Sequence, residues 1–237
     1  MLVIYSLASL VVATSICIVA GAKRPWLVQF SFAAVVVASL ATASKIVPTS
    51  FGTTASVAVG LYSMTFLMAN FLREIYGKSA AIVAIQGGFI GSFIFVFATQ
   101  FAIIVPGAEF WQNQTPFEIV FGIAPRIFLA SITAFVIAEL ADVYVYQFLM
   151  NRTSGRHLWL RNNVGTITGQ TLDTIIFYTI AFYGIVPNLI WLILGTILIK
   201  ILISLATTPA IYLARHIALR GEKTYAVVDP DLPVTRK

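Results

Sequence analysis

The chain has 237 residues, of which 59% are hydrophobic and 10% are charged, and its mean hydropathy is +0.92. Soluble domains carry about 25% charged residues, so this composition excludes a water-soluble enzyme. The apolar runs are continuous rather than alternating, which excludes a transmembrane β-barrel. The formal net charge is +6, and in so apolar a chain it indicates membrane orientation rather than nucleic-acid binding.

Seven apolar stretches follow one another along the chain, and each is long enough for a transmembrane helix of about 20 residues. The predicted spans are residues 2–20, 26–43, 55–72, 79–105, 125–148, 164–183 and 189–213. We expect loops at 47–52 and 106–117 and a basic loop at 151–163. The sequence therefore predicts an all-α fold, a polytopic integral membrane bundle of about seven transmembrane helices.

Basic residues fall on one side of the predicted membrane. Twelve of them occupy alternate loops and the C-terminal tail, namely Lys23, Arg24, Arg73, Lys78, Arg152, Arg156, Arg161, Arg215, Arg220, Lys223, Arg236 and Lys237. The opposite side carries Lys45 beside Glu109 and Glu118. Because cytoplasmic loops are enriched in Lys and Arg, we expect the N-terminus outside the cell membrane and the C-terminus in the cytoplasm.

Polar residues inside the predicted spans are the candidates for function, because ionisable groups in a bilayer are costly. They are Asn70 and Glu74, Glu139 and Asp142, Gln170 and Asp173, and Lys200. The second and third pairs lie about 8–12 residues from the 151–163 loop, which is roughly 12–18 Å deep and close to the midplane. We therefore expect them to meet at one depth, where transport sites form.

Structural alternatives remain open for these residues. Single amides such as Gln86 and Gln100 more often link helices by hydrogen bonds. Asp173 with Lys200 or Arg126 would make a buried ion pair, and Arg126 by itself would reach the outer interface. Three acids so close together are harder to explain by helix packing alone.

The chemistry of the cluster suits a flat, polar ligand. A carboxylate accepts two parallel hydrogen bonds, and the N1–H and 2-amino edge of a guanine-like ring offers two such donors. Amides at Asn162, Asn163 and Gln170 supply further contacts, and aromatic rings can stack on a base, the candidates being Tyr144, Phe177, Tyr178 and Phe182. These arguments permit a heterocyclic base but do not select it over an amine, an amino acid or a metal ion.

Four ordered segments carry a family resemblance. Residues 67–78 read LMANFLREIYGK, close to T-D-x-x-x-E-x-[YF]-G-K, and residues 124–127 read APRI, close to A-R-I. Residues 139–143 read ELADV, close to Q-x-x-D-V. Residues 159–166 and 170–174 read WLRNNVGT and QTLDT, close to W-x-R-N-x-x-S-T and Q-x-x-D-T. Together they resemble the queuosine-precursor transporter family, also called the vitamin-uptake-transporter-like family.

The resemblance implies a transporter, not an enzyme. It implies import of a 7-deazaguanine base such as preQ0 or preQ1, or of queuine, across the cytoplasmic membrane for tRNA modification. Residues 26–215 would form a core of six transmembrane helices, with 1–25 an additional N-terminal helix and 216–237 a cytoplasmic tail. The substrate-binding residues it implies are Asn70, Glu74, Arg126, Glu139, Asp142, Asn162, Gln170 and Asp173.

Partners and cofactors follow from the same resemblance. The partners expected are a small purine-like substrate and the lipid bilayer, without nucleic acid. No ATPase subunit is implied, in agreement with the lack of a G-x-x-x-x-G-K-[ST] loop, and the oligomeric state is left open. No cofactor or metal is expected, although Asp173 or Glu139 could carry a coupling proton.

The sequence departs from the family pattern at four positions. Asn70 stands in place of Asp, Arg73 in place of Asn, Glu139 in place of Gln, and Gly165 in place of Ser. The extra carboxylate at 139 favours a substrate with an aminomethyl cation over one with a nitrile.

Two other functions compete with the one that the resemblance implies. The first is a carrier or a substrate-capture subunit for another small nutrient or vitamin. The second is an intramembrane enzyme, which the sequence disfavours because His157 and His216 fall near the predicted cytoplasmic surface and Cys17 has no partner. No H-E-x-x-H or G-x-S-x-G motif is present.

Overall fold

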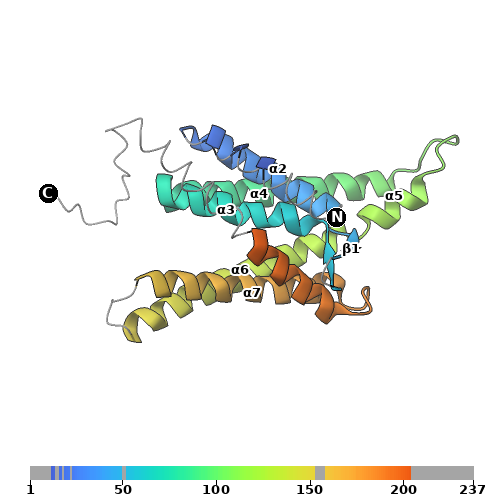
Figure 1. Cartoon of the computed structure of the whole chain (residues 1–237). Coiled ribbons are helices and arrows are strands. Elements are labelled where there is room, and N and C mark those ends of the chain that lie inside the picture. The colour runs from blue at the N-terminus through green and yellow to red at the C-terminus, as the bar shows by residue number, and fades with distance from the viewer. Residues whose placement is uncertain are drawn as a thin grey trace. The chain divides into compact units, whose positions relative to one another are not determined.

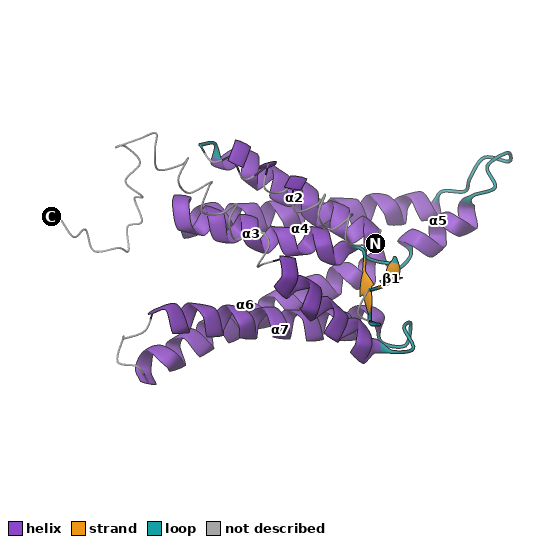
Figure 2. Ribbon diagram, viewed as in Figure 1, coloured by secondary structure: helices purple, strands orange, loops and turns teal. Residues whose placement is uncertain are grey.

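The computed structural model describes residues 12–13, 16–17, 19–21, 23–49, 52–152 and 158–203. These residues are helical apart from their turns and one short hairpin (Figure 2), so the all-α class is confirmed. Most of the predicted first span, 2–20, lies outside the described residues, as do the end of the seventh span and the tail 216–237. Nothing in the structure therefore tests those segments.

Three described helical stretches are long and apolar enough to cross a membrane. They are Pro25–Thr42, which is α2, Lys78–Ile104, which is α4, and Gln114–Ala138. The last stretch comprises α5 (Gln114–Phe121) and the first half of α6 (Ala124–Arg152), separated by a turn at Gly122. The remaining helices are α3 (Ala58–Tyr76), α7 (Leu158–Phe182) and the helix Leu189–Ile203.

The outer surface of α4 has the composition of a lipid-facing helix. Ile90, Phe97 and Ile104 are 61%, 69% and 79% exposed, and so continuous an apolar face is rare on a protein surface in contact with water. In a bilayer these side chains contact acyl chains, so their exposure carries no hydration penalty. The surface therefore agrees with the hydropathy of the helix in making it a membrane span.

The described residues, whose elements are labelled in Figure 1, divide into two compact units. The first unit holds the described residues up to Ser39, Ala58–Ser92 and the described residues from Lys200 to Ile203, and the second holds Leu40–Val57 and Phe93–Ile199.

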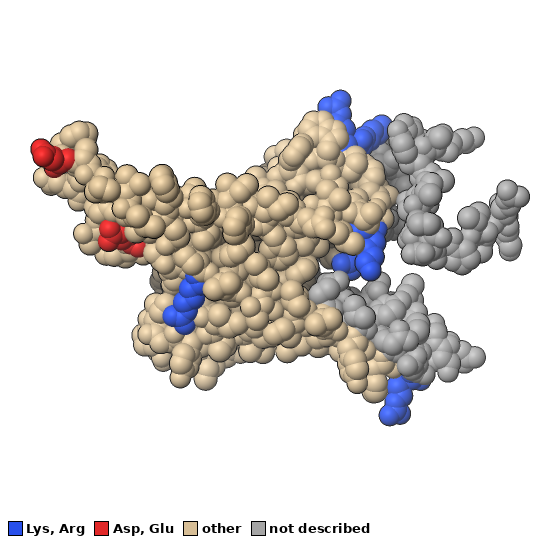
Figure 3. All heavy atoms as spheres, turned by 180° about the vertical axis from the view of Figure 1, so that it is seen from behind, with Lys and Arg blue, Asp and Glu red and all other residues tan. Residues whose placement is uncertain are grey.

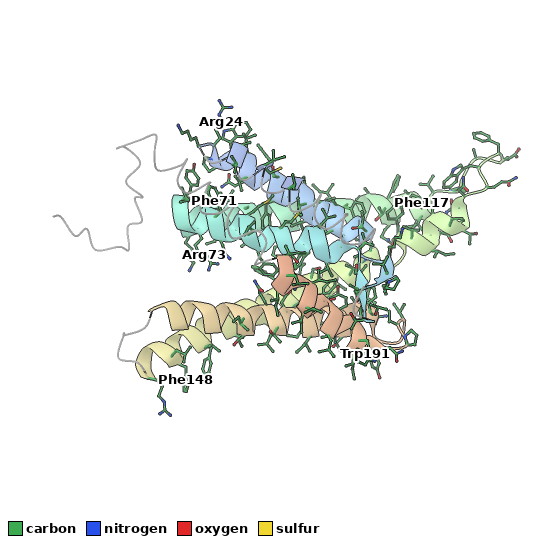
Figure 4. The ribbon with its side chains drawn as sticks, in the orientation of Figure 1. Arg24, Phe71, Arg73, Phe117, Phe148 and Trp191 are labelled. Atoms are coloured by element: carbon green, nitrogen blue, oxygen red, sulfur yellow. The ribbon has the colours of Figure 1, made fainter. Side chains whose placement is uncertain are left out.

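In the first unit, α2 and the first half of α4 run parallel. The Gln29 side chain donates to the Ala80 carbonyl at 3.1 Å. Further along, a Cβ added at Gly88 would lie 3.0 Å from the Phe32 ring, and one at Gly91 would lie 3.0 Å from Val37. Small residues let helices approach closely in membranes. Phe71 of α3, labelled in Figure 4, is fully buried in the same core.

Basic side chains gather at one end of the first unit. Gly77 joins α3 to α4 with φ +86°, a left-handed conformation that glycine adopts without a Cβ penalty. Arg73 and Lys78 flank this turn, and Lys23 and Arg24 precede α2 at the same end (Figures 3 and 4). The charge pattern predicted from the sequence thus forms one basic end within this unit.

The second unit is built on antiparallel helices. The last part of α4 lies along α5, because Gln100 donates to the Phe121 carbonyl at 3.1 Å and Gln114 donates to the Ile103 carbonyl at 3.0 Å. Helices α6 and α7 pack against each other, and Arg126 at the start of α6 contacts Tyr183, just beyond the end of α7.

Three local predictions are wrong. The expected loop at 47–52 belongs to an antiparallel hairpin, in which β1 (Ile46–Pro48) pairs with β2 (Thr54–Ser56). The expected loop at 106–117 ends in the first turn of α5, whose aromatic residues pack on one another. Helix α7 begins at Leu158, six residues before the predicted start of the sixth span at 164, because a basic, polar sequence such as Arg161-Asn162-Asn163 does not prevent a helix.

Candidate functional site

Asp173 is the buried acid of the second unit. Its side chain is 4% exposed, and it lies nine residues before the end of α7. At 1.5 Å per residue this is about 13 Å from the end of the helix, close to half the thickness of a hydrocarbon core of about 30 Å. A buried carboxylate needs polar neighbours, and those of Asp173 define the candidate site.

Tyr178 is one of these polar neighbours. Its side chain is 3% exposed, and its hydroxyl lies beside the backbone of Ser56 and the Thr196 side chain and within electrostatic range of the Asp173 carboxylate. The Tyr178 ring stacks on Phe182 at 5.5 Å with a 24° interplanar angle, and Phe177 meets it edge-on at 5.1 Å. These three aromatic rings pack on one another and hold the phenol in place; their stacking on a substrate stays a prediction.

The β1–β2 hairpin brings Ser56 to this cluster. Ser56 is 4% exposed, and its hydroxyl donates to the Ala43 carbonyl at 2.8 Å. The hairpin packs on the helix Leu189–Ile203 at Gly195, where an added Cβ would lie 2.3 Å from the Thr54 carbonyl oxygen and 2.7 Å from the Thr53 hydroxyl. Only glycine permits so close an approach between a helix and a strand.

Thr196 follows Gly195 and faces the same cluster. It is 0% exposed and lies beside the Tyr178 hydroxyl, and its own hydroxyl oxygen has no hydrogen-bond partner in the described part of the chain. Three elements therefore converge: α7 supplies Asp173 and Tyr178, the hairpin supplies Ser56, and the following helix supplies Thr196.

Arg126 caps the C-terminal end of α7. Its Nε donates to the Ile180 carbonyl and its Nη2 to the Tyr183 carbonyl, both at 2.7 Å. The last carbonyls of a helix have no partner within the helix, and a cation is favourable there. The guanidinium thus has a structural partner at the helix end.

The first unit has its own buried cation. Lys200 is 8% exposed, and its Nζ lies 5.5 Å from the centre of the Tyr62 ring and 5.2 Å from that of Phe66. The two rings, one helical turn apart on α3, meet edge-on at 5.4 Å. Aromatic faces attract a cation, so this pair helps to hold an ammonium group inside an apolar unit.

Comparison with known proteins identifies the family of the chain. The model of a family described as "Putative vitamin uptake transporter" matches residues 56–214. A protein of Bacillus subtilis (strain 168) named "Probable queuosine precursor transporter" is 36% identical over 177 residues, which is 73% of this chain and 77% of the relative. This chain belongs to that transporter family. No solved structure matches it.

The transporter is therefore a multi-pass membrane protein, and the resemblance seen in its motifs is confirmed. The matched residues include all four members of the buried cluster, Ser56, Asp173, Tyr178 and Thr196. The cluster thus lies within the part of the chain that defines the family.

The sequence-predicted site residues fall into two groups. The side chains of Glu74, Glu139, Asp142 and Asn162 lie outside the described part of the structure, and their roles stay predictions. The other four are described, and they are Asn70, Arg126, Gln170 and Asp173. Gln170 is half-buried one turn from Asp173, and its carbonyl accepts a hydrogen bond from Thr174 at 2.7 Å. Asn70 is exposed on α3, in the first unit.

Sequence reasoning missed Ser56 and Thr196 as neighbours of Asp173. Hydroxyl residues are common in apolar helices, where they bond to their own backbone, so neither stands out by composition. The Gly195-Thr196 pair in an otherwise apolar run is the signal that was available, because a glycine at a membrane helix interface marks a close contact.

Replacing Arg126 by Lys should destabilise the transporter without altering its substrate affinity. A lysine keeps the charge but cannot donate two hydrogen bonds in a fixed fork, so losing one of them costs about 1.5–3 kcal/mol. We expect a lower melting temperature in detergent and an unchanged KM per folded molecule. Arg152→Lys, at the exposed end of α6, is the control. A changed KM at unchanged melting temperature would instead support a place for Arg126 in the substrate site, as the family resemblance implies.

Proposed function

We propose that this transporter imports a queuosine precursor, a 7-deazaguanine base or queuine, across the cytoplasmic membrane. The match with the Bacillus subtilis protein carries the proposal, because that relative is named for this substrate and shares 36% of the aligned residues. The imported base would enter tRNA modification. The protein acts as a carrier and not as an enzyme.

The buried Asp173 gives the proposal a chemical basis. The N1–H and 2-amino groups of a 7-deazaguanine point in the same direction, so one carboxylate can accept both. Asp173 and Glu139 would hold this donor edge, and Gln170 and Asn162 would contact the remaining polar atoms. A carboxylate shielded from water gains more from such bonds than an exposed one, and Asp173 is 4% exposed.

We further propose that the N-terminus faces the outside and the C-terminus the cytoplasm. The support is the basic end of the first unit, formed by Lys23, Arg24, Arg73 and Lys78, because positive loops stay in the cytoplasm. Helix α4 begins beside this basic end, and its other end leads into the loop that carries Glu109. Labelling of single cysteines introduced at 24 and at 109 in intact cells checks the orientation: only the second should react with an impermeant reagent.

The test of function is uptake by cells that can neither make nor import queuosine precursors. Cells expressing the transporter should accumulate labelled preQ1, preQ0 or queuine above the level of cells with an empty vector. The cells should also regain the modified nucleoside in tRNA, and guanine should compete poorly. If membrane insertion is verified and none of these bases enters, the proposed substrate is wrong.

The same assay compares amine and nitrile forms of the base. The additional acid Glu139 leads us to expect preQ1, with its aminomethyl cation, to compete better than preQ0. A clear preference for the nitrile would contradict this part of the proposal while leaving the substrate class intact.

A further inference from the structure

The buried hydroxyl of Thr196 lacks an explanation in the fold. Its oxygen has no hydrogen-bond partner among the described residues, and the residue is 0% exposed. Buried hydroxyls are nearly always paired, because removing one from water without a new bond costs stability. Thr99 shows the usual solution: it is 9% exposed and donates to the carbonyls of Phe95 and Val96 at 2.9 and 3.0 Å.

The Thr196 hydroxyl lies among groups that can bind a ligand. Thr196 faces Tyr178, whose hydroxyl also lies beside the backbone of Ser56 and within electrostatic range of Asp173. Stacking on Phe182 fixes the Tyr178 ring, and the contact of Gly195 with the hairpin fixes the adjacent residue of the helix. Two hydroxyls are thus held next to each other within electrostatic range of a carboxylate, as a preorganised binding site requires.

Carboxylate and hydroxyls offer complementary chemistry to one ligand. An ionised carboxylate only accepts hydrogen bonds, whereas Thr and Tyr hydroxyls also donate them. A planar base of the deazaguanine type presents donors along one edge and acceptors, a carbonyl oxygen and a ring nitrogen, at neighbouring positions. A site with Asp173 alone would satisfy only the donors.

We propose that Thr196 and Tyr178 form a second polar contact of the substrate site, donating to an acceptor atom of the base whose donor edge lies on Asp173. The hairpin, through the backbone of Ser56, orients the Tyr178 hydroxyl and forms a wall of this site. The proposal rests on the proposed function. It adds Ser56 and Thr196, which the sequence did not single out, and it gives Tyr178 a hydrogen-bonding role in place of stacking.

The test measures KM and stability for Thr196→Val and Tyr178→Phe. Thr196→Val keeps the shape of the side chain and removes an unpaired hydroxyl, so the melting temperature should stay the same or rise, while the KM for the transported base rises about tenfold, the value of one lost hydrogen bond. A merely structural hydroxyl would lower stability instead. Thr99→Val is the control, whose KM should equal that of the parent.

Substrate analogues identify the contact itself. In the parent, an analogue that lacks the paired ring nitrogen or carbonyl oxygen should bind about tenfold more weakly. In Thr196→Val the same analogue should lose nothing further, because the partner is already gone. An analogue that lacks the 2-amino group should lose affinity equally in both proteins, since its partner is Asp173.

Two outcomes overturn the proposal and are distinguishable. If the parent transports the base and Thr196→Val has an unchanged KM, or loses affinity for all analogues by the same factor, the second contact is wrong and the proposed function stands. If the parent transports none of the bases, the proposed function fails and this contact fails with it.

Discussion

Asp173→Asn is expected to reduce uptake of the base at least a hundredfold, in kcat/KM per molecule inserted. The amide keeps the size of the side chain but replaces an accepting oxygen by an NH2 group, which would face the donor edge of the base. Hydrogen bonds to a charged group contribute about 1.5–3 kcal/mol each, and two of them correspond to about 10²–10⁴-fold. Labelled uptake, normalised to membrane content, measures the effect.

Glu118→Gln is the matched control for this substitution. It makes the same chemical change on an exposed acid of α5, whose carboxylate accepts a hydrogen bond from Gln114 at 2.7 Å. Uptake by this variant should equal that of the parent. Normal uptake by a well-inserted Asp173→Asn protein would remove Asp173 from the substrate site, and a loss of folded protein in proportion to uptake would make its role structural.

The spans with strong hydropathy could be predicted closely from sequence. The stretch predicted as 26–43 is α2, Pro25–Thr42, and that predicted as 79–105 is α4, Lys78–Ile104. The hydrophobic effect acts on each helix separately, because each must match the same bilayer. Proline at the second residue of α6 also marked its start, at Ala124.

The hairpin could not be predicted in this way. Its strands have three residues each, too short for a period-2 pattern, and an isolated two-stranded hairpin is marginal at best. It is held by tertiary contacts, chiefly the approach of Thr54 to Gly195, about 140 residues away in the chain. Contacts of this range leave no local signature in a single sequence.

Only part of the candidate site could likewise be predicted from the sequence. The burial of Asp173 was expected from its place in an apolar run, and it is 4% exposed. Its hydroxyl neighbours come from other elements, so only the fold reveals them. The contacts of Arg126 also could not be predicted from the sequence. Its place beside Pro125 suggests the outer interface, whereas it donates hydrogen bonds to two carbonyls at the end of α7.

Gly195→Ala should displace the hairpin and abolish most transport. The new methyl carbon would lie 2.3 Å from the Thr54 carbonyl oxygen, a backbone atom that cannot rotate away, and 2.7 Å from the Thr53 hydroxyl. Overpacking of this kind costs about 1–3 kcal/mol or more, and relief requires the hairpin to move away from the helix. The melting temperature in detergent should fall, and uptake per molecule should fall with it, because Ser56 no longer orients Tyr178.

Gly87→Ala separates this effect from the general cost of altering a glycine in a membrane helix. A Cβ at Gly87 meets only the Ala33 methyl, at an ordinary 3.8 Å, so this variant should be as stable and as active as the parent. If Gly195→Ala behaves like Gly87→Ala, the hairpin is not seated on Gly195. If Gly195→Ala is unstable but transports normally per folded molecule, the hairpin supports the fold and forms no wall of the site.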